Sequence, residues 1–597
     1  MFSDQTFHAQ REAWWQARKY TPERMEAAHA ALQDVRAGVP VFEAIKRHPL
    51  TSEGGGYVGK QFLIAAYRKA VELGEMEPDR KLLERLRMKP MRTLSGVTTV
   101  TVLTKPYPCP GKCIFCPTDY RMPKSYLPDE PGAMRALQHQ FDPYTQVRER
   151  LTALEAIGHP TDKIELLILG GTWSSYRRDY QEWFILRCFQ AMNEDRRDIP
   201  EPADHDSIFS FRDALTAAQQ VNETAQHRNV GLVIETRPDH ITPDELAWLR
   251  HLGVTKVQMG AQSFDDHILE INQRGHTVQA TLDATAMLRA AGFKIVLHWM
   301  PNLLGATPDG DREDFIRFWQ GFCPDEIKIY PNQLLANAEL YEYWLRGEFH
   351  PYKTDELVHL ITDVKTTIPR YCRVNRVIRD IPSTNVVEGN KRTSLRMDVH
   401  KELKRRGEKC ECVRCREVRK EHVEPDELRL DDLIYQADHA EEHFLSFVTP
   451  SDKLAGFLRL SLPYSEAPVE KGSSVESVDT RTPETSTRFR RRWEKRVSPT
   501  SDTQPAAQVS DLLTDLAGAA IIREVHVYGQ SLPVGDEKDG AAQHIGLGTE
   551  LIEHAEKIAR ERGYFRLAVI AAVGTRKYYE DRGFERGNLY LVKILTP

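Results

Sequence analysis

The chain has 597 residues, a length at which several domains are expected because one domain usually takes roughly 150 residues. Hydrophobic residues make up 41% and charged residues 28%, which excludes a wholly disordered chain, a collagen-like chain and a small disulfide-stapled scaffold. The formal net charge is -6, so a nucleic-acid partner would have to bind a local basic surface.

Residues 1–93 are predicted to be helical. Apolar residues recur every three or four positions over residues 13–17, 22–37, 41–47 and 59–73. Arg85, Arg87, Lys89 and Arg92 follow, which fits either a solvated helix end or part of an RNA-binding surface. The first twenty residues carry charges and no apolar core, and no run of about 18 apolar residues occurs. We therefore expect no signal peptide, no membrane partner and a cytoplasmic location.

Residues 94–385 alternate between predicted strands and helices. The strands are expected over residues 97–103, 164–170, 230–236, 256–261, 294–299 and 326–330. Helical stretches over residues 143–157, 178–192, 213–222, 243–252 and 277–291 separate them. Repeated β-α units of this spacing predict parallel strands, and their extent favours a full or partial β/α barrel.

Residues 386–435 form a basic, cysteine-bearing linker, and residues 436–597 are expected to form a mixed α/β domain. Strands are predicted there over residues 444–448, 456–462, 521–528, 566–570 and 589–594, with helices over residues 548–562 and 576–582. Residues 464–510 are rich in Ser, Thr, Pro and Arg, and their low hydrophobicity predicts a flexible insertion.

The nine cysteines are distributed as two tight triplets and three single residues. This is a poor disulfide framework and a good metal-binding pattern. Cys109, Cys113 and Cys116 have the spacing C-x3-C-x2-C just after the first barrel strand. Three such thiolates can hold three irons of a [4Fe-4S] cluster and leave the fourth iron open to another ligand. An incomplete zinc knuckle, or plain loop cysteines, is the alternative.

This triplet and the β-α repeat resemble those of radical S-adenosylmethionine (SAM) enzymes. Phe115, directly before the last cysteine, agrees with the resemblance. It implies that the open iron chelates SAM, whose reductive cleavage releases a 5′-deoxyadenosyl radical, and hence that an external electron donor is needed. Gly170 and Gly171 follow the second strand and resemble the family's glycine motif near SAM, although a pair of glycines alone is more often a turn.

A glycine-rich segment precedes the predicted helix 548–562. Gln543, Gly546 and Gly548 form the pattern Q-x-x-G-x-G between a strand and a helix, where backbone N–H groups suit a pyrophosphate. With residues 524–527 before it and Tyr578-Tyr579 after it, the segment resembles the acetyl-CoA loop of GNAT-type acetyltransferases. For one of the two tyrosines we expect simple helix packing.

A radical SAM barrel joined to a GNAT-type domain resembles the catalytic subunit family of Elongator, from about residue 85 to the end. The segments 87–96, 129–135, 142–144, 234–239, 257–263, 379–382 and 523–529 support this resemblance. It implies formation of 5-carboxymethyluridine at wobble uridine 34 of tRNA, with the radical taking hydrogen from the methyl group of acetyl-CoA. The implied catalytic residues are Cys109, Cys113, Cys116, Lys163, Tyr578 and Tyr579. The implied acetyl-CoA contacts are Lys163, Glu524, Val525, His526, Val527, Leu547, Gly548, Thr549 and Tyr579.

The second triplet, Cys410, Cys412 and Cys415, falls within six residues and predicts a structural zinc site. A second iron–sulfur cluster is the alternative. The candidates for the fourth ligand are His400, His422, Cys372 and Cys323. The surrounding basic residues are expected to bind a tRNA anticodon stem-loop: Lys391, Arg392, Arg396, Lys401, Lys404, Arg405, Arg406, Lys409, Arg414, Arg416, Arg419 and Lys420.

Two other functions remain open from the sequence. One is a protein lysine acetyltransferase whose iron–sulfur barrel is only structural, and the other is an RNA-binding scaffold that retains acetyl-CoA. The choice of tRNA, and whether the protein forms a homodimer, are open as well.

Overall fold

The computed structural model describes residues 19–51, 55–90, 93–202, 210–419, 421, 423–437, 439–464, 509, 511–528 and 546–596. The predicted helix over residues 13–17, nearly all of the insertion 464–510, and the residues Arg92, Lys420, His422 and Gln543 lie outside these ranges. No helix in the described ranges is long and apolar enough to cross a membrane.

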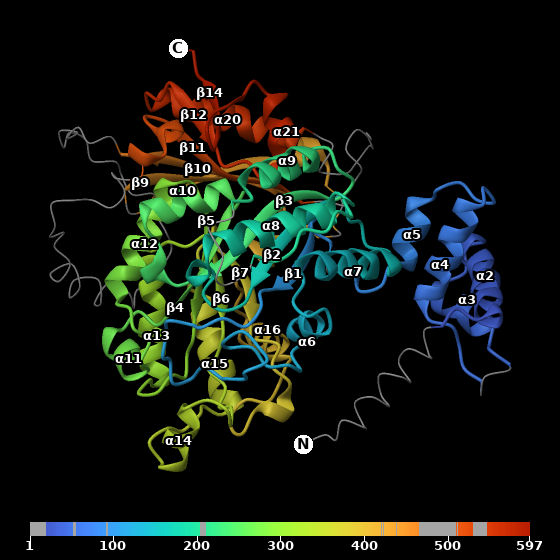
Figure 1. Ribbon diagram of the computed structural model, residues 1–597, viewed down its shortest axis with the longest axis horizontal. Coiled ribbons are helices and arrows are strands. Elements are labelled where there is room, and N and C mark those ends of the chain that lie inside the picture. The colour runs from blue at the N-terminus through green and yellow to red at the C-terminus, as the bar shows by residue number, and fades with distance from the viewer. Residues whose placement is uncertain are drawn as a thin grey trace.

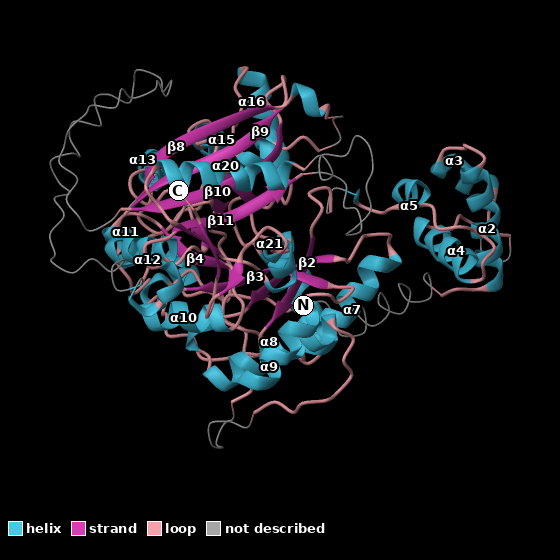
Figure 2. Cartoon of the chain, turned by 90° about the horizontal axis from the view of Figure 1, so that it is seen from above, coloured by secondary structure: helices cyan, strands magenta, loops and turns pink. Residues whose placement is uncertain are grey.

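The N-terminal helices form a small lobe with its own hydrophobic core, beside the rest of the molecule (Figures 1 and 2). Thr21 and Asp79 cap two of these helices by accepting hydrogen bonds from backbone N–H groups. The lobe meets the barrel where Arg87 Nε donates a hydrogen bond to the carbonyl of Gly158 over 2.9 Å. Its helices are α2 (Pro22–Arg36), α3 (Val41–Arg47), α4 (Lys60–Glu72) and α5 (Arg80–Leu86).

Seven parallel strands form the central sheet, in the same order in space as in the chain. They are β1 (Thr98–Leu103), β2 (Lys163–Leu169), β3 (Arg228–Thr236), β4 (Lys256–Gln262), β5 (Lys294–Trp299), β6 (Glu326–Ile329) and β7 (Arg373–Val377). Because β1 and β7 pair with one neighbour each in the described sheet, the barrel is open between them. The partial β/α barrel predicted from the sequence is confirmed, with β7 as an additional strand.

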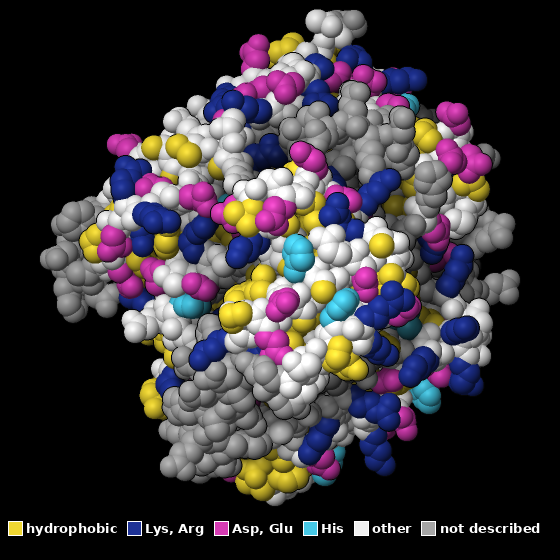
Figure 3. All heavy atoms as spheres, turned by 90° about the vertical axis from the view of Figure 1, so that its right-hand side faces the viewer, with side chains coloured by type: hydrophobic (Ala, Val, Ile, Leu, Met, Phe, Trp, Pro, Cys, Tyr) yellow, Lys and Arg dark blue, Asp and Glu magenta, His cyan; other side chains and the backbone are white. Residues whose placement is uncertain are grey.

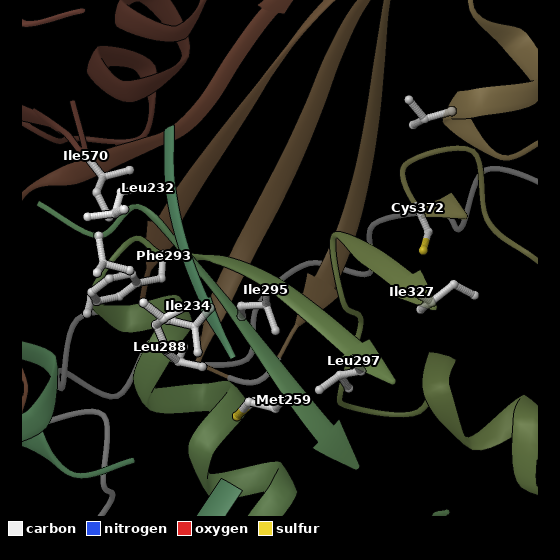
Figure 4. Close-up of a cluster of buried hydrophobic side chains, with 14 of the residues drawn as sticks. Leu232, Ile234, Met259, Leu288, Phe293, Ile295, Leu297, Ile327, Cys372 and Ile570 are labelled. Carbon is white, nitrogen blue, oxygen red and sulfur yellow. The ribbon is translucent and has the colours of Figure 1, made fainter. Parts of the chain in front are cut away.

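Helices cover the outside of this sheet (Figure 1). They are α6 (Pro131–Gln138), α7 (Pro143–Ala156), α8 (Arg178–Met192), α9 (Arg212–Asn222), α10 (Pro243–His251), α11 (Asp266–Ile271), α12 (Val278–Ala290), α13 (Pro308–Ile316) and α15 (Thr354–Lys365). The short helix α14 (Leu340–Leu345) lies beyond the sheet instead, where the Leu340 N–H donates to the carbonyl of Ile114. Alternate strand residues face these helices and are apolar, among them Ile234, Met259, Ile295 and Ile327 (Figure 4).

The second sheet has the order β13-β14-β12-β11-β10-β9-β8. Its strands are β8 (Arg429–Ala437), β9 (Ala440–Val448), β10 (Leu454–Pro463), β11 (Ala520–Val527), β12 (Arg566–Val569), β13 (Glu585–Arg586) and β14 (Leu591–Ile594). The helices α20 (Leu547–Glu561) and α21 (Arg576–Glu580) accompany it, while α16 (Leu395–Arg406) and α17 (Val413–Arg416) lie in the linker.

The second sheet begins earlier than the predicted boundary at residue 436, because β8 starts at Arg429. β8 is an edge strand, and most of its side chains are exposed or only half-buried. Its sequence therefore lacks the apolar alternation that marks a buried strand, which is why the strand was not expected.

The barrel and the second sheet share one hydrophobic core. Ile570 of the second sheet lies beside Leu232 of β3 (Figure 4). A buried ion network adds to this junction: Arg523 of β11 donates two hydrogen bonds to Asp325, at 2.9 and 2.6 Å, and also pairs with Glu442 of β9 at 2.9 Å. The amino ends of the barrel strands thus face the second sheet.

Candidate functional site

The first cysteine triplet lies on the loop that follows β1, at the carboxyl end of the barrel. All three thiols are free and half-buried, and they line the barrel cavity. Burial raises the pKa of the Cys116 thiol to about 11. Cys109 Sγ lies 3.7 Å from Thr172 Oγ1, directly after the glycine pair. The chemistry of three convergent sulfur donors fits a [4Fe-4S] cluster, each thiolate holding a different iron.

Gly170 shows why a glycine is required beside this loop. Its φ is +154°, and a Cβ at this position would lie 1.9 Å from Thr104 Oγ1. Gly170 and Gly171 both line the cavity next to the cysteines. A glycine is therefore required here by the close packing against Thr104, and its contact with SAM, which the family resemblance implies, stays a prediction.

One cavity of about 930 Å³ runs through the barrel from the cysteine loop to the second sheet. At the far end it is lined by Glu524, Val525, His526 and Tyr579. The cysteine loop and β11, which lie far apart in the sequence, therefore open into the same space, whereas Leu547, Gly548 and Thr549 do not line it.

The interior of the barrel is polar along this cavity, unlike the packed apolar interior of a complete β/α barrel. The inward residues include Glu165, Glu235, Lys256, Gln258, Lys294, His298, Glu326 and Lys328. Lys294 pairs with Glu326 at 2.6 Å and also with Glu524 of β11, so that an ion-paired layer joins the barrel to the second sheet. A polar interior of this kind leaves a cavity that suits polar ligands.

Glu524 is bound by two cations. Its side chain pairs with Lys294 and, at 2.9 Å, with Arg459 Nε. Burial would raise its pKa, but the charges of Lys294 and Arg459 outweigh burial and lower it. Glu524 is therefore ionised and held in place.

The strands β11 and β12 stop pairing just before Glu524. β11 pairs with β12 only over Ala520–Ile522, so within the described part of the sheet the β12 ladder does not continue along residues 523–526. Unpaired strand backbone can hydrogen-bond an extended ligand. The edge thus suits the pantetheine amides of the predicted acetyl-CoA.

The start of α20 meets the end of β11 at Gly548. A Cβ on Gly548 would lie 2.5 Å from the hydroxyl of Tyr578 and 3.8 Å from Val527 Cγ2. Gly546, the N-cap, has a left-handed φ of +80°. The helix N-terminus with Leu547, Gly548 and Thr549 is thereby brought to the strand edge, the arrangement that binds a pyrophosphate.

The two tyrosines of α21 have different surroundings. Tyr579 is 7% exposed and lines the cavity, whereas Tyr578 is 36% exposed and stacks against the Arg582 guanidinium, 3.6 Å from the ring centre. Burial raises the pKa of both phenols. Both are therefore protonated near neutral pH.

Lys163 and His526 lie at the end of the barrel that faces the second sheet. Lys163 begins β2 and does not line the cavity, and burial lowers its pKa. His526 is neutral at pH 7 because burial lowers its pKa to about 4. The Nε2 atom of His526 has no hydrogen-bond partner within the described chain.

The second cysteine triplet forms a compact sulfur cluster. The Sγ atoms of Cys410, Cys412 and Cys415 all lie within 4.8 Å of one another. Sulfur atoms around a tetrahedral zinc, with Zn–S bonds of about 2.3 Å, lie about 3.8 Å apart, so the three can share one ion. Hydrogen bonds from Cys410 and Cys415, together with the charge of Lys365, lower the pKa of Cys412. The triplet could therefore hold a metal.

The structure separates the candidates for a fourth ligand. Cys323 points elsewhere, with its Sγ 3.8 Å from the carbonyl of Gln436. Cys372 and His400 are close enough to Cys412 for their charges to interact. Neither joins the cluster within 4.8 Å, so the described residues supply three ligands at this spacing.

The basic residues around the second triplet are not all available for RNA. Several are bound by neighbouring carboxylates: Arg405, Arg406 and Arg416. Arg414 and Arg419 line the cavity instead. On the face that carries the N-terminal helices, Lys and Arg side chains are interspersed with Asp and Glu (Figure 3).

Comparison with known proteins agrees with this geometry. The family model "Radical SAM superfamily" matches residues 107–318, and "Radical_SAM C-terminal domain" matches residues 324–405. The tRNA uridine(34) acetyltransferase of Methanocaldococcus jannaschii is 38% identical over 536 residues, covering 87% of this chain and 88% of that protein. Elongator complex protein 3 of Danio rerio is 34% identical over 535 residues, covering 86% of this chain and 87% of that protein.

The chain belongs to the Elongator catalytic subunit family. The relative from Dehalococcoides mccartyi, also named tRNA uridine(34) acetyltransferase, is 38% identical over 84% of this chain and 99% of its own length. The solved archaeal Elp3 of Methanocaldococcus infernus, which lacks its N-terminus, has a TM-score of 0.65 and 34% identity, covering 84% of this chain and all of that one. A radical SAM domain implies a [4Fe-4S] cluster and SAM, which the cysteine loop and the glycine pair of this chain fit.

Several residues of the site were not assigned a role from the sequence. Arg523 and the segment 234–239 stood out as part of the family resemblance, but their partners could not be named. Lys365 has no sequence signal, since a lysine at the end of an amphipathic helix is ordinarily solvated. It is fully buried, and its Nζ has no hydrogen-bond partner in the described ranges.

Proposed function

We propose that this protein modifies the wobble uridine of tRNA, using SAM and acetyl-CoA to form 5-carboxymethyluridine. The observation that carries the proposal is the shared cavity, which is lined by the cysteine loop at one end and by the acetyl-CoA strand β11 at the other. A plain acetyltransferase needs no such passage. The names of the relatives support tRNA uridine as the substrate.

The cluster and SAM, when bound, supply a carbon-centred radical at the carboxyl end of the barrel. Cys109, Cys113 and Cys116 would hold the cluster, and Gly170-Gly171 would admit the backbone contact to SAM. An external donor would supply the electron. The cavity walls would hold the radical beside the acyl donor and limit its side reactions with other groups.

Acetyl-CoA would lie along β11 beyond its pairing with β12, beside residues 523–526, with its pyrophosphate at the N-terminus of α20. The paired state of Glu524 argues against its use as a base on the acyl donor. This supports delivery of the acetyl group into the cavity rather than transfer to a lysine. Tyr579 would then contact the acetyl-CoA end of the passage.

The tRNA anticodon stem-loop would reach the cavity through the opening between β1 and β7. Arg135, Arg150, Arg376, Arg414 and Arg419 line the cavity from elements around this opening and suit phosphate groups. The second cysteine triplet would hold a structural zinc that fixes the linker beside them. Residues 1–93 would add further phosphate contacts.

The test is anaerobic reconstitution with iron and sulfide, followed by incubation with tRNA, SAM, reductant and labelled acetyl-CoA. Nucleoside mass spectrometry should detect labelled 5-carboxymethyluridine, and Cys113→Ala should abolish it. A protein with a verified cluster that yields no modified nucleoside, yet acetylates lysine equally with and without Cys113, would support the acetyltransferase alternative. Tight tRNA binding with neither product would support the scaffold alternative.

A further inference from the structure

Two buried arginines flank the first cysteine loop, and nothing in the proposed mechanism uses them. Arg237 follows β3 and Arg274 follows α11; they are 5% and 6% exposed. Both line the cavity at the end where the three thiols lie. A buried guanidinium is costly unless its charge and its N–H groups are matched by acceptors.

Arg274 contacts the loop directly. Its Nη1 donates to Cys113 Sγ over 3.7 Å, and its Nη2 donates to the carbonyl of Gly260 over 2.7 Å. The second bond fixes the plane of the guanidinium. The Nε atom is buried and has no hydrogen-bond partner within the described chain. Arg274 therefore has one contact with a cysteine sulfur and one buried donor that no described residue accepts.

Arg237 is held in a fixed orientation by Asp239. Its Nε and Nη2 donate to the two carboxylate oxygens at 2.9 and 2.8 Å, a bidentate pair. The remaining donor, Nη1, is buried and unpartnered in the described ranges. A Cβ at Gly111 would lie 2.5 Å from Nη1, so the loop must have a glycine there to pass beneath the guanidinium. The free N–H group is thus aimed at the backbone between Cys109 and Cys113.

We propose that Arg237 and Arg274 donate hydrogen bonds to the sulfur atoms of the cluster and thereby set its reduction potential. This inference rests on the proposed function, because it requires the cluster. A cluster with thiolate and sulfide ligands presents several sulfur acceptors and negative charge, which would match both the unused donors and the buried positive charges. Hydrogen bonds to sulfur and nearby positive charge favour the reduced state, into which the donor places one additional electron. The two arginines therefore make the cluster easier to reduce.

The experiment is a potentiometric titration of the reconstituted full-length protein, followed by electron paramagnetic resonance, with titanium(III) citrate as reductant and no SAM, tRNA or acetyl-CoA. Arg237→Lys and Arg274→Lys keep the charge and remove the planar fork, whereas Arg274→Gln also removes the charge. We expect the midpoint potential to shift to more negative values in both lysine variants and further in R274Q. Arg250→Lys is the matched control: Arg250 is buried at the opposite end of the barrel, with hydrogen bonds to the second sheet, and should leave the midpoint unchanged.

Variants that load iron but keep the wild-type midpoint would overturn the inference. So would unchanged midpoints with weakened SAM binding, since the arginines would then act on SAM alone. If a substitution at Arg237 prevents loading, the two Arg274 variants decide the inference, and wild-type midpoints in both of them count against it. A wild-type protein that binds no cluster would refute both proposals, whereas shifted midpoints with no modified nucleoside would refute only the proposed function.

Discussion

Replacing Asp325 with asparagine should greatly weaken the junction between the barrel and the second sheet. The Asp325 carboxylate is fully buried and accepts two bonds from Arg523, at 2.9 and 2.6 Å, and one from the Ile295 N–H at 2.8 Å. A hydrogen bond to a charged group contributes about 1.5–3 kcal/mol, so losing the charge of two such bonds costs about 3–6 kcal/mol. Removal of one partner from a buried ion pair generally lowers the free energy of unfolding by about 3–5 kcal/mol. We therefore expect D325N to lower the free energy of unfolding by about 3–5 kcal/mol at pH 7.

The assay is urea unfolding at pH 7, followed by circular dichroism and tryptophan fluorescence. Asp198→Asn is the matched control: the Asp198 carboxylate is 88% exposed although its partner Arg187 is buried, so solvent screens this pair far more than it screens the Asp325 network. Burial alone would raise the pKa of Asp325, but the charges of Arg523 and Arg459 hold it well below its usual range. The contribution should thus be complete above the unfolded pKa of about 3.9 and fade as the pH falls below it. A urea midpoint for D325N equal to that for D198N would refute the stabilising role of the buried Asp325 carboxylate.

Three further predictions follow from single sites. Gly170→Ala should lower the free energy of unfolding by about 1–3 kcal/mol from its backbone conformation alone, with additional strain against Thr104. It should also weaken SAM binding, measured by calorimetry on the reconstituted protein, and an unchanged affinity would contradict a close approach of this backbone to SAM. Cys412→Ser should remove bound zinc, measured by plasma mass spectrometry, while the iron content stays as in the wild type; retained zinc would exclude the triplet as its site. The pKa of His443 is raised because hydrogen bonds and charges of Asp432 and Glu441 outweigh burial. The stabilisation that protonated His443 provides should therefore be complete below about pH 6.5 and be lost as the pH rises through the pKa of the folded state. His443→Gln should flatten the fall in urea midpoint between pH 6 and pH 9, and an unchanged slope would count against this pairing.

The sequence predicted the elements whose local signals are strong. Six barrel strands, the cysteine spacing and the helix after Gly546 could be read from periodicity and motif, because each signal lies within a short window. β7 was not recognised because two arginines interrupt Arg373–Val377, a pattern that is tolerated only because the barrel interior is polar.

The remaining parts of the site depend on residues that are distant in the chain. Asp325 and Arg523 are 198 positions apart, and no local pattern pairs them. The role of Gly111 likewise follows only from the position of Arg237, which the fold brings against it. Such pairings result from the topology, so they had to be read from the structure.

The claim that both ends of the cavity act in one reaction is tested most directly by following deuterium from acetyl-CoA. With a trideuterated acetyl group, SAM, reductant and tRNA, the account predicts that 5′-deoxyadenosine gains one deuterium while the tRNA gains a carboxymethyl group that retains the other two. Both products should vanish together when Cys113 is replaced by alanine. Deuterium-free 5′-deoxyadenosine, or an acetyl group transferred with all three deuterons, would contradict the claim that the two ends of the cavity act in one reaction.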